Sequence, residues 1–231
     1  NNWLDIIQNF LLPPTCLLCN GHGVGNRDLC EPCLQSLPRN YHCCYRCAEI
    51  FEQAVHTPGL CGHCLSQPPA FDETHSPFIY GENISFLIHQ LKFNRHYANA
   101  RLLGTLLADS ILTSVELPQC IIPVPLHRSR YSERGFNQAI EIAKTLAKQL
   151  DIPVDLNSCK RHRITQHQSN LPAKQRRKNL KNAFSVVKPL KYQHVAIVDD
   201  VMTTGTTVNE LAKALKKSGV ERVDVWVCAR A

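Results

Sequence analysis

The sequence has no long apolar run. Of its 231 residues, 44% are hydrophobic and 19% are charged, which is typical of a soluble globular chain. No stretch approaches the roughly 18 to 20 apolar residues that a membrane-spanning helix needs, and the run that begins at Phe10 ends at Pro13. No basic residue precedes Arg27, whereas a secretory signal has basic residues ahead of its apolar core. We therefore expect neither a transmembrane segment nor a signal peptide.

Cysteine is scarce beyond the first 64 residues, which hold nine of the twelve cysteines. Eight of these nine form pairs with two residues between their members: Cys16 and Cys19, Cys30 and Cys33, Cys44 and Cys47, and Cys61 and Cys64. Two thiolates at this spacing bind one metal ion from a tight turn, and two such turns complete a tetrahedral site. The pattern predicts two zinc ions; disulfides and an iron–sulfur cluster are the alternatives.

The order of the pairs leaves two ways to share two zinc ions. Either neighbouring pairs hold one ion together, or the first and third pairs share an ion in a cross-braced arrangement. Cys43 is a spare thiol beside the third pair. In both schemes the protein supplies all four ligands, so we expect structural sites with no open coordination position. Reduced, metal-bound cysteines also indicate the cytoplasm.

Charge divides the chain near Pro68 and Pro69. Residues 1–70 carry three basic and five acidic side chains, a net charge of −2, whereas residues 71–231 carry 23 basic and 14 acidic side chains, a net of +9. A segment of about 70 residues with few apolar runs builds little core, so metal binding would supply most of its folding free energy. We expect a zinc-binding module at 1–70 and a larger domain at 71–231.

Strand and helix patterns alternate through the larger domain. Apolar runs of strand length lie at 74–80, 120–124, 184–187, 194–198 and 223–227. Apolar residues recur at helical spacing over 84–91, 98–111, 138–150 and about 207–218. Strands that alternate with helices predict an α/β domain with a parallel sheet.

One segment, residues 195–207, joins a buried strand to acidic and hydroxyl side chains. It reads Val-Ala-Ile-Val-Asp-Asp-Val-Met-Thr-Thr-Gly-Thr-Thr. Ligands of open α/β sheets bind at the carboxyl ends of strands, and a turn that leads into a helix offers backbone N–H groups to an anion. We expect Asp199 and Asp200 at a solvent-facing strand end, where their carboxylates accept hydrogen bonds from a sugar diol.

These thirteen residues resemble the motif with which type I phosphoribosyltransferases bind phosphoribosyl pyrophosphate (PRPP). The resemblance implies that Asp199 and Asp200 bind the ribose hydroxyls, that the threonine turn holds the 5′-phosphate, and that Mg²⁺ is carried by the ligand. The remaining motif residues are Val201, Met202, Thr203, Thr204, Gly205, Thr206 and Thr207. A plain turn with capping threonines is one alternative. The acidic pocket of a receiver domain is another, although it needs far more chain than the 31 residues that follow Asp200.

Two further segments resemble the competence protein F (ComF) family. Residues 123–138 lie where phosphoribosyltransferases have their pyrophosphate loop, with the candidates His127, Arg128, Arg130 and Arg134. Residues 161–184 resemble the family's mobile loop, which would fold over bound PRPP, with the candidates Arg161, Arg163, Thr165, Gln166, Arg176 and Arg177. The resemblance covers nearly the whole chain, including Lys92 and Phe93, and departs at Cys43 and at 51–60. It implies a type I phosphoribosyltransferase fold behind a zinc module.

Residues 160–191 contain ten Lys or Arg and no Asp or Glu. Such a run is a solvated basic face, a loop that closes on pyrophosphate or a contact with nucleic acid. The resemblance accordingly implies one of two functions. The first is transfer of phosphoribosyl from PRPP to an acceptor base or amine. The second is non-catalytic handling of single-stranded DNA during natural transformation, with other competence proteins as partners and the PRPP site as a sensor or relic. The sequence identifies neither a catalytic residue nor the acceptor.

Overall fold

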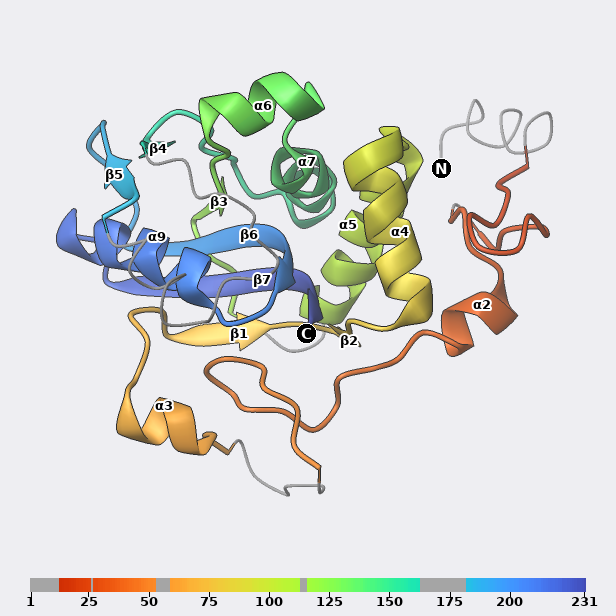
Figure 1. Ribbon diagram of the computed structural model, residues 1–231, viewed down its shortest axis with the longest axis horizontal. Coiled ribbons are helices and arrows are strands. Elements are labelled where there is room, and N and C mark those ends of the chain that lie inside the picture. Colours follow the sequence, from red (N-terminus) through yellow and green to blue (C-terminus); the bar gives the residue numbers. More distant parts are fainter. Residues whose placement is uncertain (1–12, 26, 53–58, 113–115, 163–181) are drawn as a thin grey trace.

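A computed structural model describes residues 13–25, 27–52, 59–112, 116–162 and 182–231. Its centre is a parallel sheet in the order β1-β7-β6-β3, with β2 pairing with the far part of β7 (Figure 1). The strands are β1 (Glu73–His75), β2 (Phe78–Ile79), β3 (Cys120–Pro123), β6 (His194–Met202) and β7 (Arg222–Arg230). The parallel α/β architecture expected from the alternating pattern is therefore confirmed.

Three strands differ by several residues from their predicted ranges, and one of them is β7, which covers Arg222–Arg230 where 223–227 was expected. The run at 74–80 is split into β1 and β2 around Pro77, because proline has no N–H to donate to a neighbouring strand. The strand expected at 194–198 continues to Met202, and Asp199, Val201 and Met202 all stay in register with β7. The acidic pair therefore lies inside β6, and the strand ends four residues later than predicted.

Side chains that alternate along the strands divide the core into two layers. Ala196 and Val198 of β6 and Trp226 of β7 pack on one face against α4 (Glu82–Asn94), α5 (Tyr97–Leu112) and α7 (Gln138–Leu150). The side chains between them, such as Val195 and Ile197, pack on the other face against α9 (Thr206–Lys217). Figure 1 shows α9 on the opposite side of β6 from α7.

Two smaller elements lie near the carboxyl end of β3. Helix α6 (Arg128–Arg134) follows β3 and precedes α7. The antiparallel strands β4 (Cys159–Arg161) and β5 (Phe184–Val186) form a hairpin beside α9, with Arg161 opposite Phe184 (Figure 1). The hairpin encloses residues 163–181, which lie outside the described ranges.

The cysteine-rich part contains two short helices, α2 (Glu31–Gln35) and α3 (Gly62–Ser66), joined by a chain that runs beneath β2 and β1 (Figure 1). It shares the core of the larger domain, because Cys16, Leu29 and Leu37 are buried in the same apolar cluster as α4 and α5. No helix within the described ranges combines the length and the apolar character needed to cross a bilayer.

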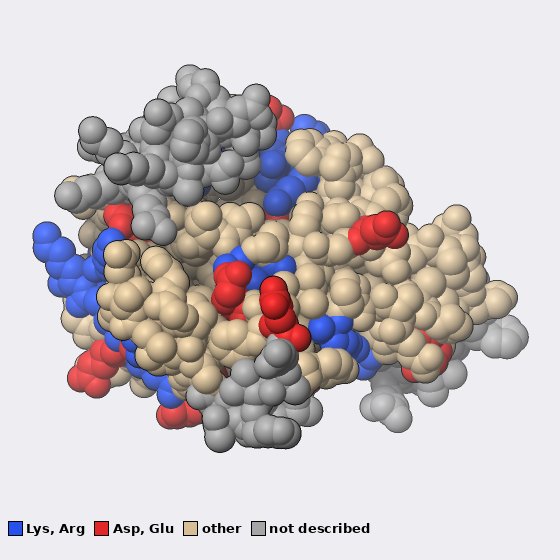
Figure 2. Space-filling model, turned by 60° about the horizontal axis from the view of Figure 1, so that its bottom comes forward, with Lys and Arg blue, Asp and Glu red and all other residues tan. Residues whose placement is uncertain are grey.

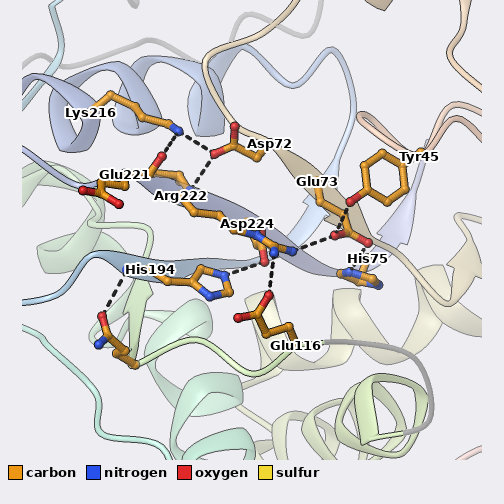
Figure 3. A network of polar contacts seen from close by, with 12 residues as sticks. Tyr45, Asp72, Glu73, His75, Glu116, His194, Lys216, Glu221, Arg222 and Asp224 are labelled. Atoms are coloured by element: carbon orange, nitrogen blue, oxygen red, sulfur yellow. Dashed lines mark hydrogen bonds and ion pairs between the residues drawn. The ribbon is translucent and has the colours of Figure 1, made fainter.

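Polar contacts at the amino-terminal ends of β6 and β7 also join the two parts (Figure 3). The Tyr45 hydroxyl donates a hydrogen bond to Glu73 over 2.7 Å. The Arg222 guanidinium binds Glu73 at 2.9 Å and the buried Asp224 at 3.1 Å, and His194 lies 2.7 Å from the Asp224 carboxylate. Tyr45 lies between two cysteines of the third pair, so this network connects that pair directly to the sheet.

Candidate functional site

The eight paired cysteines form two four-cysteine clusters: Cys16, Cys19, Cys30 and Cys33, and Cys44, Cys47, Cys61 and Cys64. Within each cluster all ligand atoms lie within 4.8 Å of one another, and the Cys19–Cys30 and Cys47–Cys61 Sγ separations are 3.6 and 3.5 Å. Four thiolates about 2.3 Å from a tetrahedral zinc ion are about 3.8 Å apart, so both clusters fit this metal. Neighbouring pairs are joined, and the cross-braced alternative is not the arrangement found.

The electrostatics of the clusters also favour a cation. Burial opposes ionisation of the Cys16 thiol, but the backbone N–H groups of Cys30 and Cys19 outweigh it and help to lower its pKa to about 6. The pKa of Cys44 is lowered in the same way. Burial, reinforced by Cys61, raises the pKa of Cys64 to about 12. Without a cation, some thiols of a cluster ionise readily and others resist ionisation. A divalent cation would allow all four to ionise, because a coordinating thiol is deprotonated. Cys43 belongs to neither cluster.

The acidic pair is less accessible than the sequence suggested. Asp200 is 3% exposed, because it follows Ala196 and Val198 onto the face of β6 that α4 and α7 cover. Its Oδ2 forms an ion pair with Lys92 Nζ, and its Oδ1 accepts a hydrogen bond from Gln138 Nε2 over 3.2 Å. The expectation of a solvent-facing pair is therefore wrong for Asp200, whereas Asp199 is half-buried.

Helix ends bring the two partners to Asp200. Lys92 lies in the last turn of α4, where the helix dipole favours a cation. Asn137 caps α7 by accepting a hydrogen bond from the Ala139 N–H over 3.0 Å, and its amide donates to the Val124 carbonyl over 3.0 Å. This capping fixes the start of α7 to the end of β3 and thereby directs Gln138 toward Asp200.

The two carboxyl groups have opposite pKa shifts. Burial raises the pKa of Asp199, and the charge of Asp200 raises it further. Burial also acts against ionisation of Asp200, but the Lys92 ammonium outweighs it and holds the pKa of Asp200 below its usual range. Two carboxylates that share a site resist double ionisation. In the free protein the negative charge of the pair therefore rests mainly on Asp200.

Arginines of α6 and β4 lie close enough to the pair for their charges to interact with it. Arg134, the last residue of α6, donates a hydrogen bond to Gln138 Oε1 over 2.6 Å. Arg161 of β4 lies with its guanidinium 5.5 Å from the centre of the Phe184 ring. Burial lowers the pKa of both arginines, while Asp200 acts against this at Arg134 and Asp199 does so at Arg161. Arg130 lies near enough to lower both pKa values further.

The predicted pyrophosphate loop contains a helix rather than an open loop. His127 caps α6 by accepting a hydrogen bond from the Ser129 N–H over 3.2 Å, and Gly135 ends it with a left-handed φ of 81°. Arg128 is exposed in its first turn. Of the predicted mobile-loop residues, only Arg161 lies within the described ranges; Arg163, Thr165, Gln166, Arg176 and Arg177 fall outside them.

The threonine turn leads directly into α9. Gly205 has a φ of 70°, a conformation that glycine adopts without steric cost. Thr203 and Thr204 are exposed, and the hydroxyls of Thr204 and Thr206 are 2.8 Å apart. No side chain caps the first turn of this twelve-residue helix. Its amino-terminal N–H groups and dipole therefore suit an anion.

Sequence reasoning missed Lys92 and Gln138 as partners of the acidic pair. In the sequence, Lys92 is recognisable only as part of a family resemblance, and Gln138 only as the start of a helix. A single basic residue in the last turn of an apolar helix was the available signal for Lys92. It did not indicate which carboxylate the ammonium would reach, because that depends on how α4 packs on the sheet.

Both parts of the chain are similar to domains of known proteins. Residues 7–65 match the double zinc ribbon domain, and residues 137–231 match the phosphoribosyl transferase domain. The chain is 40% identical to competence protein F of Haemophilus influenzae, covering 94% of this chain and 96% of that protein. It is 36% identical to the DNA utilization protein YhgH of Escherichia coli K12, covering 95% and 98%. It is 22% identical to competence protein ComFC of Streptococcus pneumoniae, covering 66% of each. The chain belongs to the competence protein F family, and it joins a double zinc ribbon to a phosphoribosyltransferase domain.

Proposed function

We propose that the phosphoribosyltransferase domain binds PRPP with Mg²⁺ and transfers its phosphoribosyl group to an acceptor. The observation that carries this proposal is the arrangement of Asp199 and Asp200 in β6, directly before the exposed residues Thr203 and Thr204 of the turn that leads into α9. A carboxylate pair suits the ribose hydroxyls, and the turn from Thr203 to Thr207 suits the 5′-phosphate. Val201 and Met202 belong to the strand that joins the two.

The two aspartates have different roles in this proposal. Asp200 is held by Lys92 and Gln138, so its orientation is fixed before any ligand arrives. The ion pair with Lys92 is made by Asp200, whereas burial raises the pKa of Asp199. Ribose hydroxyls that donate to Asp199 would favour its ionised form. We assign Asp199 as the main acceptor for the diol and Asp200 as the fixed carboxylate beside it.

The basic side chains suit the leaving group. His127, Arg128 and Arg130 precede α7 and Arg161 comes from β4, whereas Arg134 of the same loop is held by Gln138. Pyrophosphate is highly charged, and fixed cations stabilise the charge that develops on it as it departs. Arg163, Thr165, Gln166, Arg176 and Arg177 would complete this environment by closing over the ligand.

The proposed transfer is a substitution at C1 of the ribose. A lone pair on an acceptor nitrogen forms the new bond to C1, the C1–oxygen bond breaks, and its electron pair leaves with pyrophosphate. The proton on the acceptor nitrogen then passes to solvent or to pyrophosphate. Mg²⁺ bound to the pyrophosphate and the ribose hydroxyls would neutralise negative charge. We assign no general acid or base.

The family relatives suggest the biological setting. One is named for competence and another for DNA utilization, so we propose a role in the uptake or use of DNA. Thiol-liganded zinc ions are compatible with the reducing cytoplasm, where such a role would be carried out. In this proposal the zinc ribbon is structural and supports the sheet at β1 and β7.

The second candidate is a non-catalytic factor that handles single-stranded DNA. The acid-free run at 160–191 favours it. By contrast, the face that carries the chain beneath β1 shows basic and acidic side chains intermixed among neutral ones (Figure 2), so a phosphate backbone would have to follow another surface. If the run grips DNA, changing Lys174, Arg176, Arg177 and Lys178 to Ala should flatten the log–log salt dependence by about two to three units.

Phosphorus NMR of the protein with PRPP, Mg²⁺ and candidate bases tests the transfer directly. We expect conversion of the diphosphate signals of PRPP to free pyrophosphate only when an acceptor is present, and loss of this conversion in Asp199→Asn. PRPP that binds but stays intact with every acceptor, together with salt-sensitive DNA binding that disappears in the quadruple variant, would favour the non-catalytic factor.

A further inference from the structure

An exposed aromatic side chain lies at the end of α4, directly after the lysine that binds Asp200. Phe93 is 64% exposed although its neighbour Lys92 reaches into the site. Tyr97, at the start of α5, is 50% exposed. Single exposed aromatics are ordinary on protein surfaces, so exposure alone does not make Phe93 a binding site. The residues around it decide this.

The groups around Phe93 are planar rings and a guanidinium cation. The Arg134 guanidinium lies 5.8 Å from the centre of the Phe93 ring, and the His89 ring lies 4.6 Å from it. Tyr97 packs edge-on against the buried Phe136 at 5.2 Å, which fixes the position of the tyrosine ring. Aromatic rings and guanidinium planes are the surfaces on which nitrogen heterocycles stack.

A short chain of contacts connects this surface to the acidic pair. Arg134 donates to Gln138 over 2.6 Å, and Gln138 donates to Asp200 over 3.2 Å. Lys92 makes a second connection, because its side chain binds Asp200 and its backbone continues into Phe93. An acceptor nitrogen that attacks C1 of a ribose held at Asp199 and Asp200 must carry its ring to a surface beside these carboxylates.

We propose that Phe93, Arg134 and Tyr97 form the subsite for the ring of the acceptor, and that the acceptor is therefore a planar nitrogen heterocycle. The inference rests on the proposed function, since it assigns a second ligand to the same site. An aliphatic amine would gain little from stacking surfaces, so the subsite selects a base over an amine. The base is either free or part of a nucleic-acid strand, because both present the same ring.

Phe93→Leu tests the subsite, and Phe86→Leu is its matched control. Leucine keeps the apolar character and removes the ring, and Phe86 is an exposed phenylalanine two turns earlier on α4. Saturation-transfer NMR would measure binding of adenine, hypoxanthine and uracil, and separately of a twelve-residue oligothymidylate. Ribose 5-phosphate with Mg²⁺ would occupy the PRPP site without supplying a leaving group. Calorimetry would give the PRPP affinity of each variant.

We expect at least one base to bind and Phe93→Leu to weaken it about tenfold, the change that corresponds to about 1.4 kcal/mol of stacking. Phe86→Leu should leave this affinity unchanged, and neither variant should alter PRPP affinity. Binding of the oligothymidylate alone, weakened by Phe93→Leu, would identify a strand as the source of the base. PRPP binding with no base or strand bound, or binding unaffected by Phe93→Leu, would overturn the subsite. Absence of PRPP binding in the unmodified protein would instead refute the proposed function on which it rests.

Discussion

Lys92 in the last turn of α4 forms an ion pair with Asp200, a carboxylate that is 3% exposed within β6. This contact joins the helical layer to the strand that carries the PRPP motif. It also makes the two motif aspartates unequal, because Lys92 lowers the pKa of Asp200 whereas burial raises that of Asp199.

Removing the lysine charge should destabilise the protein. Lys92→Met leaves Asp200 buried without its cation, and breaking a buried pair of this kind costs about 3 kcal/mol. Chemical denaturation would measure the loss. The double variant Lys92→Met with Asp200→Asn should recover most of it, because a neutral amide can keep the Gln138 contact without a buried charge. Equal stabilities of the single and double variants would contradict a pairing role for Lys92.

Substitution of Asp200 should lower the stability of the protein, whereas substitution of Asp199 should lower its affinity for PRPP. Asp200→Asn leaves the Lys92 ammonium without its partner, so we expect a lower free energy of unfolding. Asp199→Asn should leave that free energy nearly unchanged, since burial already favours the neutral form of Asp199. It should weaken PRPP binding by about 1.5 to 3 kcal/mol, the usual value of a hydrogen bond to a charged group. Thermal melting and calorimetry of both variants would show whether the effects divide in this way.

PRPP affinity should depend on pH through Asp199. Burial and the charge of Asp200 raise the pKa of Asp199 to about 8. Ribose hydroxyls prefer its ionised form, so affinity should increase as the pH rises through this value and should decrease below it. Calorimetric titrations on both sides of this pKa would measure the change. Asp199→Asn serves as the control, because the part of the dependence that belongs to this carboxyl should disappear while titration of PRPP itself remains.

Zinc content should follow cluster membership. Elemental analysis should give two zinc ions per chain, one ion in Cys16→Ser or Cys61→Ser, and two in Cys43→Ser, whose thiol lies outside both clusters. Loss of either zinc ion should lower the melting temperature of the whole chain. Cys16 belongs to the core shared with α4 and α5, and the Arg230 guanidinium of β7 donates to the Cys47 carbonyl over 3.2 Å. Two zinc ions in Cys61→Ser, or one in Cys43→Ser, would contradict the assigned ligand sets.

Periodic patterns predicted the elements of the larger domain well. The helix at 138–150 was found at its expected bounds, because its apolar stripe is strong and Asn137 provides a capping side chain. The paired cysteines gave the ligand set of both clusters in the same way. Their partition was left open, since the spacing within a pair does not determine which pairs meet. That depends on how the chain folds between them.

The environment of the acidic pair was not predictable from the motif. A one-residue step along a strand reverses the direction of a side chain, so the sequence Asp-Asp does not reveal which carboxylate is covered. The partner of Asp200 comes from a helix far away in the sequence, and the packing of α4 against the sheet decides that contact. The helix at Arg128–Arg134 was likewise not predicted, because it has no buried apolar residue and its charges are typical of a ligand-binding loop.

A calorimetric titration of the zinc-loaded chain with PRPP, in the presence and absence of Mg²⁺, shows whether the acidic pair and the threonine turn bind this ligand. We expect one PRPP per chain, binding that depends on Mg²⁺, and a marked loss of affinity in Asp199→Asn at unchanged zinc content. A folded, zinc-loaded protein that shows no Mg²⁺-dependent heat with PRPP, or that binds PRPP equally well as Asp199→Asn, would contradict the assignment of this site.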